Sequence, residues 1–104
     1  MSGPAEYAIP LFSLIDRSKV DLEQPLPESL AEQLALFLKA SFGIESLSPQ
    51  LYRLGDEAYL VLHQVPEKCL PALCSLVDVQ RTQLYRYERT DQETVTLTPL
   101  NVKI

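Results

Sequence analysis

The strongest constraint on the fold is a Gly-Asp pair, Gly55-Asp56, that separates two alternating segments within residues 51–65. Such a pair is typical of a two-residue β-hairpin turn, because glycine accepts the positive φ that a type I′ or II′ turn requires. The sequence therefore predicts a hairpin, and counting outward from the turn fixes its register. The predicted opposed pairs are Leu54 with Glu57, Arg53 with Ala58, Tyr52 with Tyr59, and Leu51 with Leu60.

Alternation divides the side chains of this hairpin between two faces of a sheet, because successive strand residues point to opposite sides. One predicted face is aliphatic and suits a hydrophobic core; it carries Leu51, Ala58, Leu60 and Leu62. The other face is aromatic and partly polar; it carries Tyr52, Tyr59, Val61 and His63. The second face is the clearest functional clue in the sequence.

The segment 27–42 predicts a helix. Pro27 suits a first helical position, and Glu28 complements the positive end of the helix dipole. Gly43 fits the left-handed residue just past the helix end. At 100° per residue one broad apolar stripe forms; it contains Leu30, Ala31, Leu34, Phe37, Leu38, Ser41 and Phe42. Leu36 falls with the polar residues, and is either a lone exposed leucine or part of a contact.

Local patterns predict the remaining elements. Residues 7–15 alternate as a strand, which Pro10 would confine to an edge or a kinked start because proline cannot donate to the ladder. Two segments connect the strands and helices: a charged loop over 16–26, and an irregular turn from Pro66 followed by a short helix from Pro71 to Val79. The last predicted elements are a strand over 82–89, a polar turn over 90–93 and a strand over 94–98 that Pro99 stops.

The resulting order is β-α-β-β-α-β-β. Two helices alternating with hairpins predict an α+β fold, a mostly antiparallel sheet with both helices packed on one face. The length of 104 residues fits a single domain. Residues 1–5 and about 99–104 are expected to be mobile tails.

Composition favours some partners over others. Nine Lys and Arg residues against fourteen Asp and Glu residues give a net charge of −5, which repels a phosphate backbone. The spacing of Cys69 and Cys74 matches neither a redox motif nor a zinc motif, and both are expected to be buried free thiols in a reducing compartment. Neither a signal peptide nor an apolar run of about 20 residues is present, so we expect a cytoplasmic protein without membrane insertion.

Motifs for catalysis, metals or cofactors are absent from the sequence. His63 is the only histidine, and its spacing from Cys69 and Cys74 matches no zinc pattern. The three glycines are isolated, so there is no phosphate-binding loop, and no serine lies in a nucleophile elbow. The sequence therefore predicts neither an enzyme nor a cofactor-binding protein, and His63 is expected to be an ordinary strand residue.

The segment 81–89 contains a second aromatic pattern. In strand geometry Arg81, Tyr85, Tyr87 and Arg89 share one face, and such a face can stack single-stranded bases. The net acidity, the central Glu88 and the lack of an RNP-like motif disfavour nucleic-acid binding, which ranks third among the hypotheses.

The leading hypothesis is a non-enzymatic protein-interaction module, such as an adaptor, an assembly or accessory factor or a small regulatory subunit. Its expected site is a tyrosine-rich patch on the sheet face away from the helices: Tyr52, Tyr59, His63, Arg81, Tyr85, Tyr87 and Arg89. The competing view is that a homodimer mate or the segment around Leu11 and Phe12 covers this face. The alternative function is a small-molecule-binding regulator or small enzyme with a pocket between sheet and helices.

Overall fold

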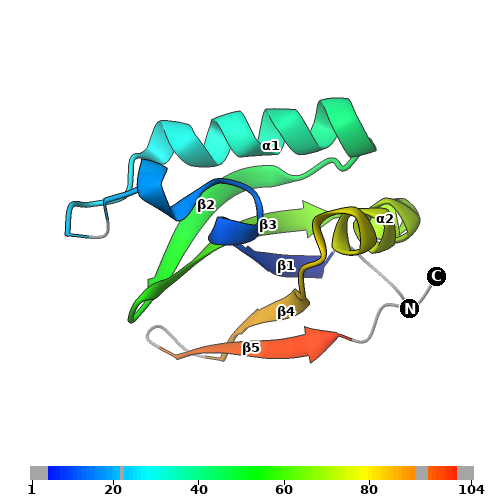
Figure 1. The fold of residues 1–104 in the computed structure, drawn as a ribbon. Helices are drawn as coiled ribbons and strands as arrows, with labels where there is room; N and C mark the ends of the chain where they lie inside the picture. Colours follow the sequence, from blue (N-terminus) through cyan, green and yellow to red (C-terminus); the bar gives the residue numbers. More distant parts are fainter. Residues whose placement is uncertain (1–4, 22, 91–93, 101–104) are drawn as a thin grey trace.

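The computed structural model describes residues 5–21, 23–90 and 94–100 (Figure 1). They form one antiparallel sheet with two α-helices on the same side, as the sequence predicts. The strands are β1 (Ala5–Pro10), β2 (Leu47–Leu54), β3 (Glu57–Val65), β4 (Leu84–Arg89) and β5 (Val95–Leu100), and the helices are α1 (Glu28–Phe42) and α2 (Leu70–Gln80). Short 3-10 helices lie at Leu11–Ser13, Arg17–Lys19 and Glu67–Cys69.

The spatial order of the strands is β2-β3-β1-β4-β5, so β1 lies at the centre of the sheet. The prediction that Pro10 confines this strand to an edge is therefore wrong. β1 ends at Pro10, and its pairing with β4 involves only Tyr7 and Ala8, so the missing N–H of Pro10 falls beyond that ladder. The chain then enters a 3-10 helix at Leu11 instead of continuing as a strand to Ile15.

The predicted β2–β3 hairpin is confirmed at every pair. Leu54 lies opposite Glu57, and the register continues through Arg53 with Ala58, Tyr52 with Tyr59 and Leu51 with Leu60. Gly55 has a φ of 63°, whereas Asp56 is not among the residues with positive φ. A positive φ at the first central residue alone is the pattern of a type II′ turn.

β2 begins earlier than the sequence indicated. It starts at Leu47, and its register against β3 shifts between Leu47 and Gln50. Ser48 in this interval has a φ of 49° and is followed by Pro49. The sequence pattern did not predict this part of the strand, because the bulge interrupts the alternation of side chains and proline is rare in strands.

Helix α1 has the predicted ends within one residue. Pro27 is the N-cap residue, and Gly43 follows the helix with a φ of 74°. The Gly43 N–H donates to the Lys39 carbonyl at 3.0 Å, and the next N–H donates to Leu38 at 3.3 Å. Phe37 was expected in the core but is 40% exposed, because it lies about 60° around the axis from Leu34 at the edge of the stripe.

Helix α2 determines where β4 can begin. Arg81 ends α2 in a left-handed conformation with a φ of 50°, and the Thr82 N–H donates to the Val77 carbonyl at 3.1 Å. β4 therefore starts at Leu84 and not at Thr82. The prediction that Arg81 lies on the strand face of Tyr85 is wrong, because Arg81 belongs to the end of the helix.

The ends of the chain also differ from the expectation. Ala5 belongs to β1, while Pro99 and Leu100 belong to β5, so these residues are not tails and Pro99 does not stop the strand. Proline is tolerated there because β5 is an edge strand. Parts of the predicted tails and of the predicted turn lie outside the described residues, namely 1–4, 101–104 and 91–93. At the described ends of this turn, the Thr90 N–H donates to the Thr94 carbonyl at 3.0 Å.

The main core lies between the sheet and the two helices. Its buried members, here called the helix-face core, are Ile9, Leu11, Ala31, Leu34, Leu38, Ile44, Ala58, Leu60, Leu62, Val65, Cys69, Leu73, Leu76 and Leu84. Most are aliphatic and many have no exposed surface. The aliphatic face predicted for the hairpin is confirmed as this core, with Leu51 packed against it.

Candidate functional site

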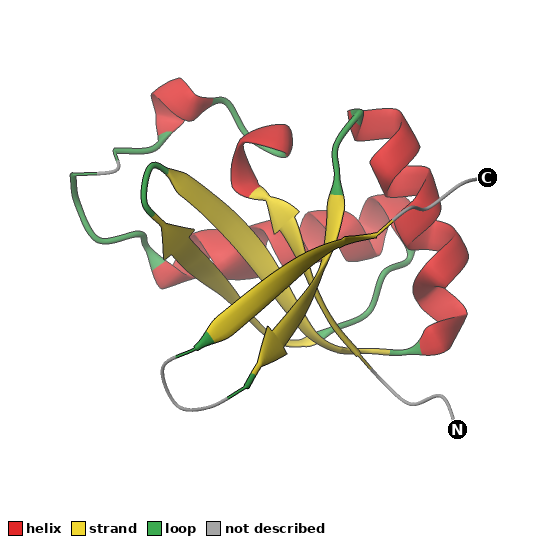
Figure 2. Cartoon of the chain, turned by 90° about the horizontal axis from the view of Figure 1, so that it is seen from below, coloured by secondary structure: helices red, strands yellow, loops and turns green. Residues whose placement is uncertain are grey.

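The opposite side of the sheet carries a second, smaller cluster, here called the tyrosine face. It consists of Ala8, Tyr52, Tyr59, Val61, His63, Tyr85, Tyr87, Val95 and Leu97. Figure 2 views the molecule from this side: the strands lie in front of α1, and α2 lies beside them. In the described part of the chain, neither helix covers the tyrosine face.

Two rings meet above the central strand. The Tyr59 ring on β3 and the Tyr85 ring on β4 have centroids 5.7 Å apart and lie nearly perpendicular, at 82°. β1 runs between these strands, so their backbones are about 10 Å apart. The residue of β1 opposite Tyr85 is Ala8, whose small side chain leaves room for the rings to touch over it.

Tyr87 is the centre of the face. The centroid of its ring lies 6.0 Å from that of Tyr52 and 5.6 Å from that of His63, and both contacts are edge-to-face. Tyr52 lies on β2, three strand spacings or about 14 Å from β4, so the sheet must curve toward this face for the rings to meet. Figure 2 shows this twist as the β4–β5 hairpin running obliquely to the β2–β3 hairpin.

Of the seven side chains that the sequence proposed, the structure brings five into ring contacts: Tyr52, Tyr59, His63, Tyr85 and Tyr87. These five differ in burial. Tyr87 is 6% exposed and is a buried centre, whereas Tyr52, Tyr59 and Tyr85 are half-buried around it. Arg89 continues the same face of β4 at its exposed end, opposite Val95. Arg81 does not join the face.

A pocket of about 450 Å³ adjoins one end of the tyrosine face. It is lined by Ala5, Glu6, Gln50, His63, Arg86, Tyr87, Glu88 and Arg89. Arg86 Nε lies 3.1 Å from Glu88 Oε1, and Glu6 Oε2 accepts the Gln64 N–H at 3.0 Å. Sequence reasoning missed Glu6, although its alternation with Ala8 along β1 was the available signal.

Burial affects the chemistry of two phenols. Burial is the main cause that raises the pKa of Tyr59 above its usual value of 10.0, and the nearby Tyr85, Glu57 and Tyr52 raise this pKa further. On the helix side, burial raises the pKa of Tyr7; Arg86 opposes this and Glu67 adds to it. The Tyr59 hydroxyl therefore stays neutral at physiological pH, so it can both donate and accept hydrogen bonds.

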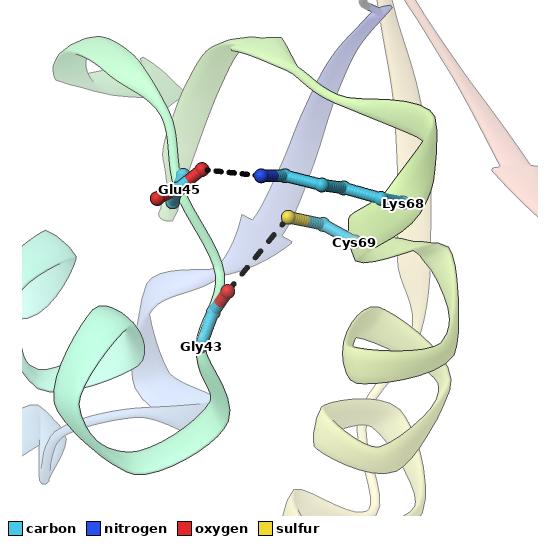
Figure 3. A network of polar contacts seen from close by, with 4 residues as sticks. All are labelled: Gly43, Glu45, Lys68 and Cys69. Atoms are coloured by element: carbon cyan, nitrogen blue, oxygen red, sulfur yellow. Dashed lines mark hydrogen bonds and ion pairs between the residues drawn. The ribbon is translucent and has the colours of Figure 1, made fainter.

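The two thiols lie on the helix side, and both are free. Cys69 is buried, and its Sγ donates to the Gly43 carbonyl at 3.8 Å, while Lys68 Nζ lies 3.3 Å from Glu45 Oε2 (Figure 3). These contacts tie the segment after α1 to the start of α2. Cys74, expected to be buried, is only half-buried.

Known proteins offer no relative for this arrangement. The chain matches no protein-family model, no curated protein and no solved structure. The described residues hold no cluster of three or more His, Cys, Asp or Glu side chains arranged to bind a metal ion. They also include no helix of the length and hydropathy needed to cross a bilayer.

Proposed function

We propose that this chain is a non-enzymatic protein-interaction module, an adaptor, accessory factor or small regulatory subunit, that binds a protein partner through the tyrosine face. One observation carries the proposal. Tyr52, Tyr59 and Tyr85 stay half-exposed although they are held by ring contacts, on a side of the sheet that neither helix covers. The two free thiols support a reducing compartment such as the cytoplasm.

Energetics favour these rings as binding residues. Tyrosine combines a large apolar contact area with a polar tip, and it is among the residues that dominate interface energies. Each half-exposed ring already packs against a second ring, so little conformational entropy remains to be lost when a partner binds. The surface is therefore organised before binding.

The surroundings of the rings resemble the rim of an interface. The half-buried His63 and the exposed Arg89 lie on the tyrosine face beside the buried Tyr87 at one end. Protein interfaces commonly have such an aromatic centre with a polar rim. Because the half-exposed rings are apolar with a polar tip, they suit an apolar segment of the partner.

The pocket beside His63 favours a second candidate, a regulator or small enzyme that binds a small molecule. Its volume of about 450 Å³ lies within the range of ligand sites. The sequence placed such a pocket between sheet and helices, but side chains without exposed surface, such as Leu38, Leu60 and Leu73, fill that space. The third hypothesis, single-stranded nucleic-acid binding, is weakened because Arg81 lies at the end of α2 and not on the predicted strand face.

Capture from extracts of the native cell tests the leading proposal. Immobilised wild type is compared with Tyr59→Ser/Tyr85→Ser and with Val79→Ser, a control at an α2 residue that is 65% exposed. We expect a partner retained by the wild type and the control but lost by the double variant, with a binding loss of about 2 kcal/mol or more. Equal recovery of every captured protein by all three forms would refute the proposal.

Two further measurements address the alternatives. Sedimentation velocity shows whether the partner is a second copy of this chain, because Tyr59→Ser/Tyr85→Ser would then shift a dimer to a monomer. A ligand for the pocket would raise the melting temperature in a concentration-dependent way. That rise would be smaller in Arg89→Ala, since Arg89 lines the pocket.

A further inference from the structure

The sheet opens between β1 and β4, beside the first residues of β1. The ladder between these two strands ends at the pair of Tyr7 and Arg86. β1 nevertheless begins at Ala5, and β4 continues to Arg89. On its other side, the pairing of β1 with β3 is also irregular here, because the register shifts between Ala5 and Tyr7. Backbone pairing therefore leaves an opening at this end of β1.

The pocket of about 450 Å³ beside His63 lies at this opening. Its walls come from both strands, with Ala5 and Glu6 from β1 and residues 86–89 from β4. Consecutive strand residues point to opposite faces, so a pocket that all four residues of β4 line reaches into the gap between the strands. The place of the pocket therefore follows from where the ladder stops.

Backbone groups of β4 face this gap. Pro99 has no N–H group, so Tyr85 and Pro99 form a pair without hydrogen bonds, and the alternate residues carry the bonds of the β4–β5 ladder. The bond from the Thr90 N–H to the Thr94 carbonyl continues this alternation. The N–H and C=O groups of Arg89 therefore point away from β5, toward the opening.

Two opposite charges line the pocket, one on each strand. Arg86 and Glu88 neutralise each other at 3.1 Å. Glu6 and Arg89 form no ion pair in the part of the chain that the structure describes. Glu6 Oε2 accepts the Gln64 N–H at 3.0 Å, which holds this carboxylate in position. β1 therefore contributes an anion and β4 a cation, and the four charged residues that line the pocket have no net charge.

The two charges select a ligand that carries both signs. Alternation places Glu6 on the same face as Ala8, and Arg89 on the same face as Tyr87, so both lie on the tyrosine face. A ligand in the pocket removes water from both charged groups, and each then needs a countercharge. A simple cation or anion would satisfy only one of them, whereas a zwitterion satisfies both.

The spacing of the two charges indicates the length of the zwitterion. In the register of the β1–β4 ladder, Glu6 is level with Tyr87, and Arg89 lies two residues further along β4. Two residues of extended chain span about 7 Å. An extended dipeptide carries its α-amino and α-carboxylate groups at nearly this separation, whereas a free amino acid carries both on one carbon atom.

We propose that this pocket binds a free dipeptide in an extended conformation, with its α-amino group at Glu6 and its α-carboxylate at Arg89. The backbone groups of Arg89 that face the opening complement the backbone of such a ligand. An apolar side chain of the dipeptide packs against the half-buried ring of His63. This proposal rests on the small-molecule candidate for the pocket and does not depend on a protein partner at the tyrosine face.

Capped ligands test the proposal without altering the protein. A panel of unmodified dipeptides built from Ala, Val, Leu and Phe is screened for a rise in melting temperature. The best dipeptide, its N-acetyl form and its C-terminal amide are then titrated by calorimetry. We expect each cap to weaken binding about tenfold, because it removes one charge and one charge-assisted hydrogen bond. The free amino acids should bind as weakly as the capped forms.

Two variants assign each ligand charge to its protein group. Glu6→Gln keeps an acceptor for the Gln64 N–H and should weaken the free dipeptide about tenfold, but leave binding of the acetylated form unchanged. Arg89→Gln should weaken the free dipeptide similarly and leave the amidated form unchanged. The control Glu32→Gln/Lys39→Gln removes one exposed acid and one exposed base from α1 and should bind every form as the wild type does.

Three results would overturn the proposal: no dipeptide of the panel raises the melting temperature, the caps leave the affinity unchanged, or each variant weakens the capped and uncapped forms equally. If another class of small molecule raises the melting temperature and no dipeptide does, the dipeptide proposal is refuted and the small-molecule candidate is retained. Capture of a protein partner is a separate measurement, so a failure here leaves the proposal for the tyrosine face unchanged.

Discussion

The two faces of the sheet bury their side chains in different ways. On β3, Leu60 has no exposed surface and packs beneath the helices, whereas its neighbour Tyr59 points to the other side and stays half-exposed. The helix-face core is mainly aliphatic and covered by two helices, while the tyrosine face is covered mainly by its own rings. One alternating strand can therefore supply folding free energy on one side and, on the other, the half-exposed aromatic surface that we propose as a binding surface.

The largest expected effect is on the helix face. Leu60→Ala should lower the free energy of unfolding by about 3 kcal/mol, because it removes a side chain with no exposed surface and leaves a cavity among other leucines. Urea unfolding measures the change, with an unchanged m-value as the control for two-state behaviour. A loss below about 1 kcal/mol would mean that this face is loosely packed.

Tyr87 should show an intermediate effect. Tyr87→Ala should cost about 2 kcal/mol, because the ring is 6% exposed but lies in a thin layer that can partly collapse. The matched control is Tyr85→Ala, on the same strand and face but half-exposed, which should cost less. Equal losses of unfolding free energy in the two variants would contradict the distinction between a buried central ring and the half-exposed rings around it.

The Gly55-Asp56 turn, which fixes the register of the hairpin, should show a smaller effect. Gly55→Val should destabilise the protein by about 1 kcal/mol or more, because a β-branched residue is strained at a φ of 63°. A Cβ at this position meets no atom within 4 Å, so the cost comes from the backbone. Gly55→Asn should cost less, since asparagine tolerates left-handed φ; equal urea midpoints for Gly55→Val and wild type would contradict the turn.

A smaller effect should appear at alkaline pH. The pKa of Tyr59 is raised in the folded state, so its stabilising contribution is complete below the unfolded value of 10.0 and is lost as pH rises through the folded value. Urea unfolding from neutral pH to about pH 11 should therefore show a shallower decline for Tyr59→Phe than for wild type. Identical declines would mean that Tyr59 titrates as a fully solvated phenol.

Short-range features of the fold were predictable from the sequence. The Gly55-Asp56 turn fixes its own register, and Gly43 marks the end of α1, because glycine conformation is a local property. The order of the strands is not local. Nothing in residues 7–10 reveals that β1 lies between β3 and β4, where its pairing with β4 stops before Pro10.

The candidate site was predictable to the same extent. Alternation placed Tyr52 with Tyr59 and Tyr85 with Tyr87, but the meeting of the two pairs depends on Ala8 in the strand between them. The placement of Arg81 failed because a non-glycine residue adopts the left-handed conformation at the end of α2. A hollow lined by Leu36 of α1 and Pro49 of β2 depends on how the helix packs on the strand, which no local pattern shows.

Paired urea unfolding of Tyr59→Ser and Leu60→Ala tests the central claim most directly, because these neighbours on β3 differ chiefly in the face they occupy. The account predicts a loss of about 1 kcal/mol or less for Tyr59→Ser, against about 3 kcal/mol for Leu60→Ala. A loss for Tyr59→Ser as large as that for Leu60→Ala would show that the tyrosine face is a second core, and would contradict its assignment as a binding surface.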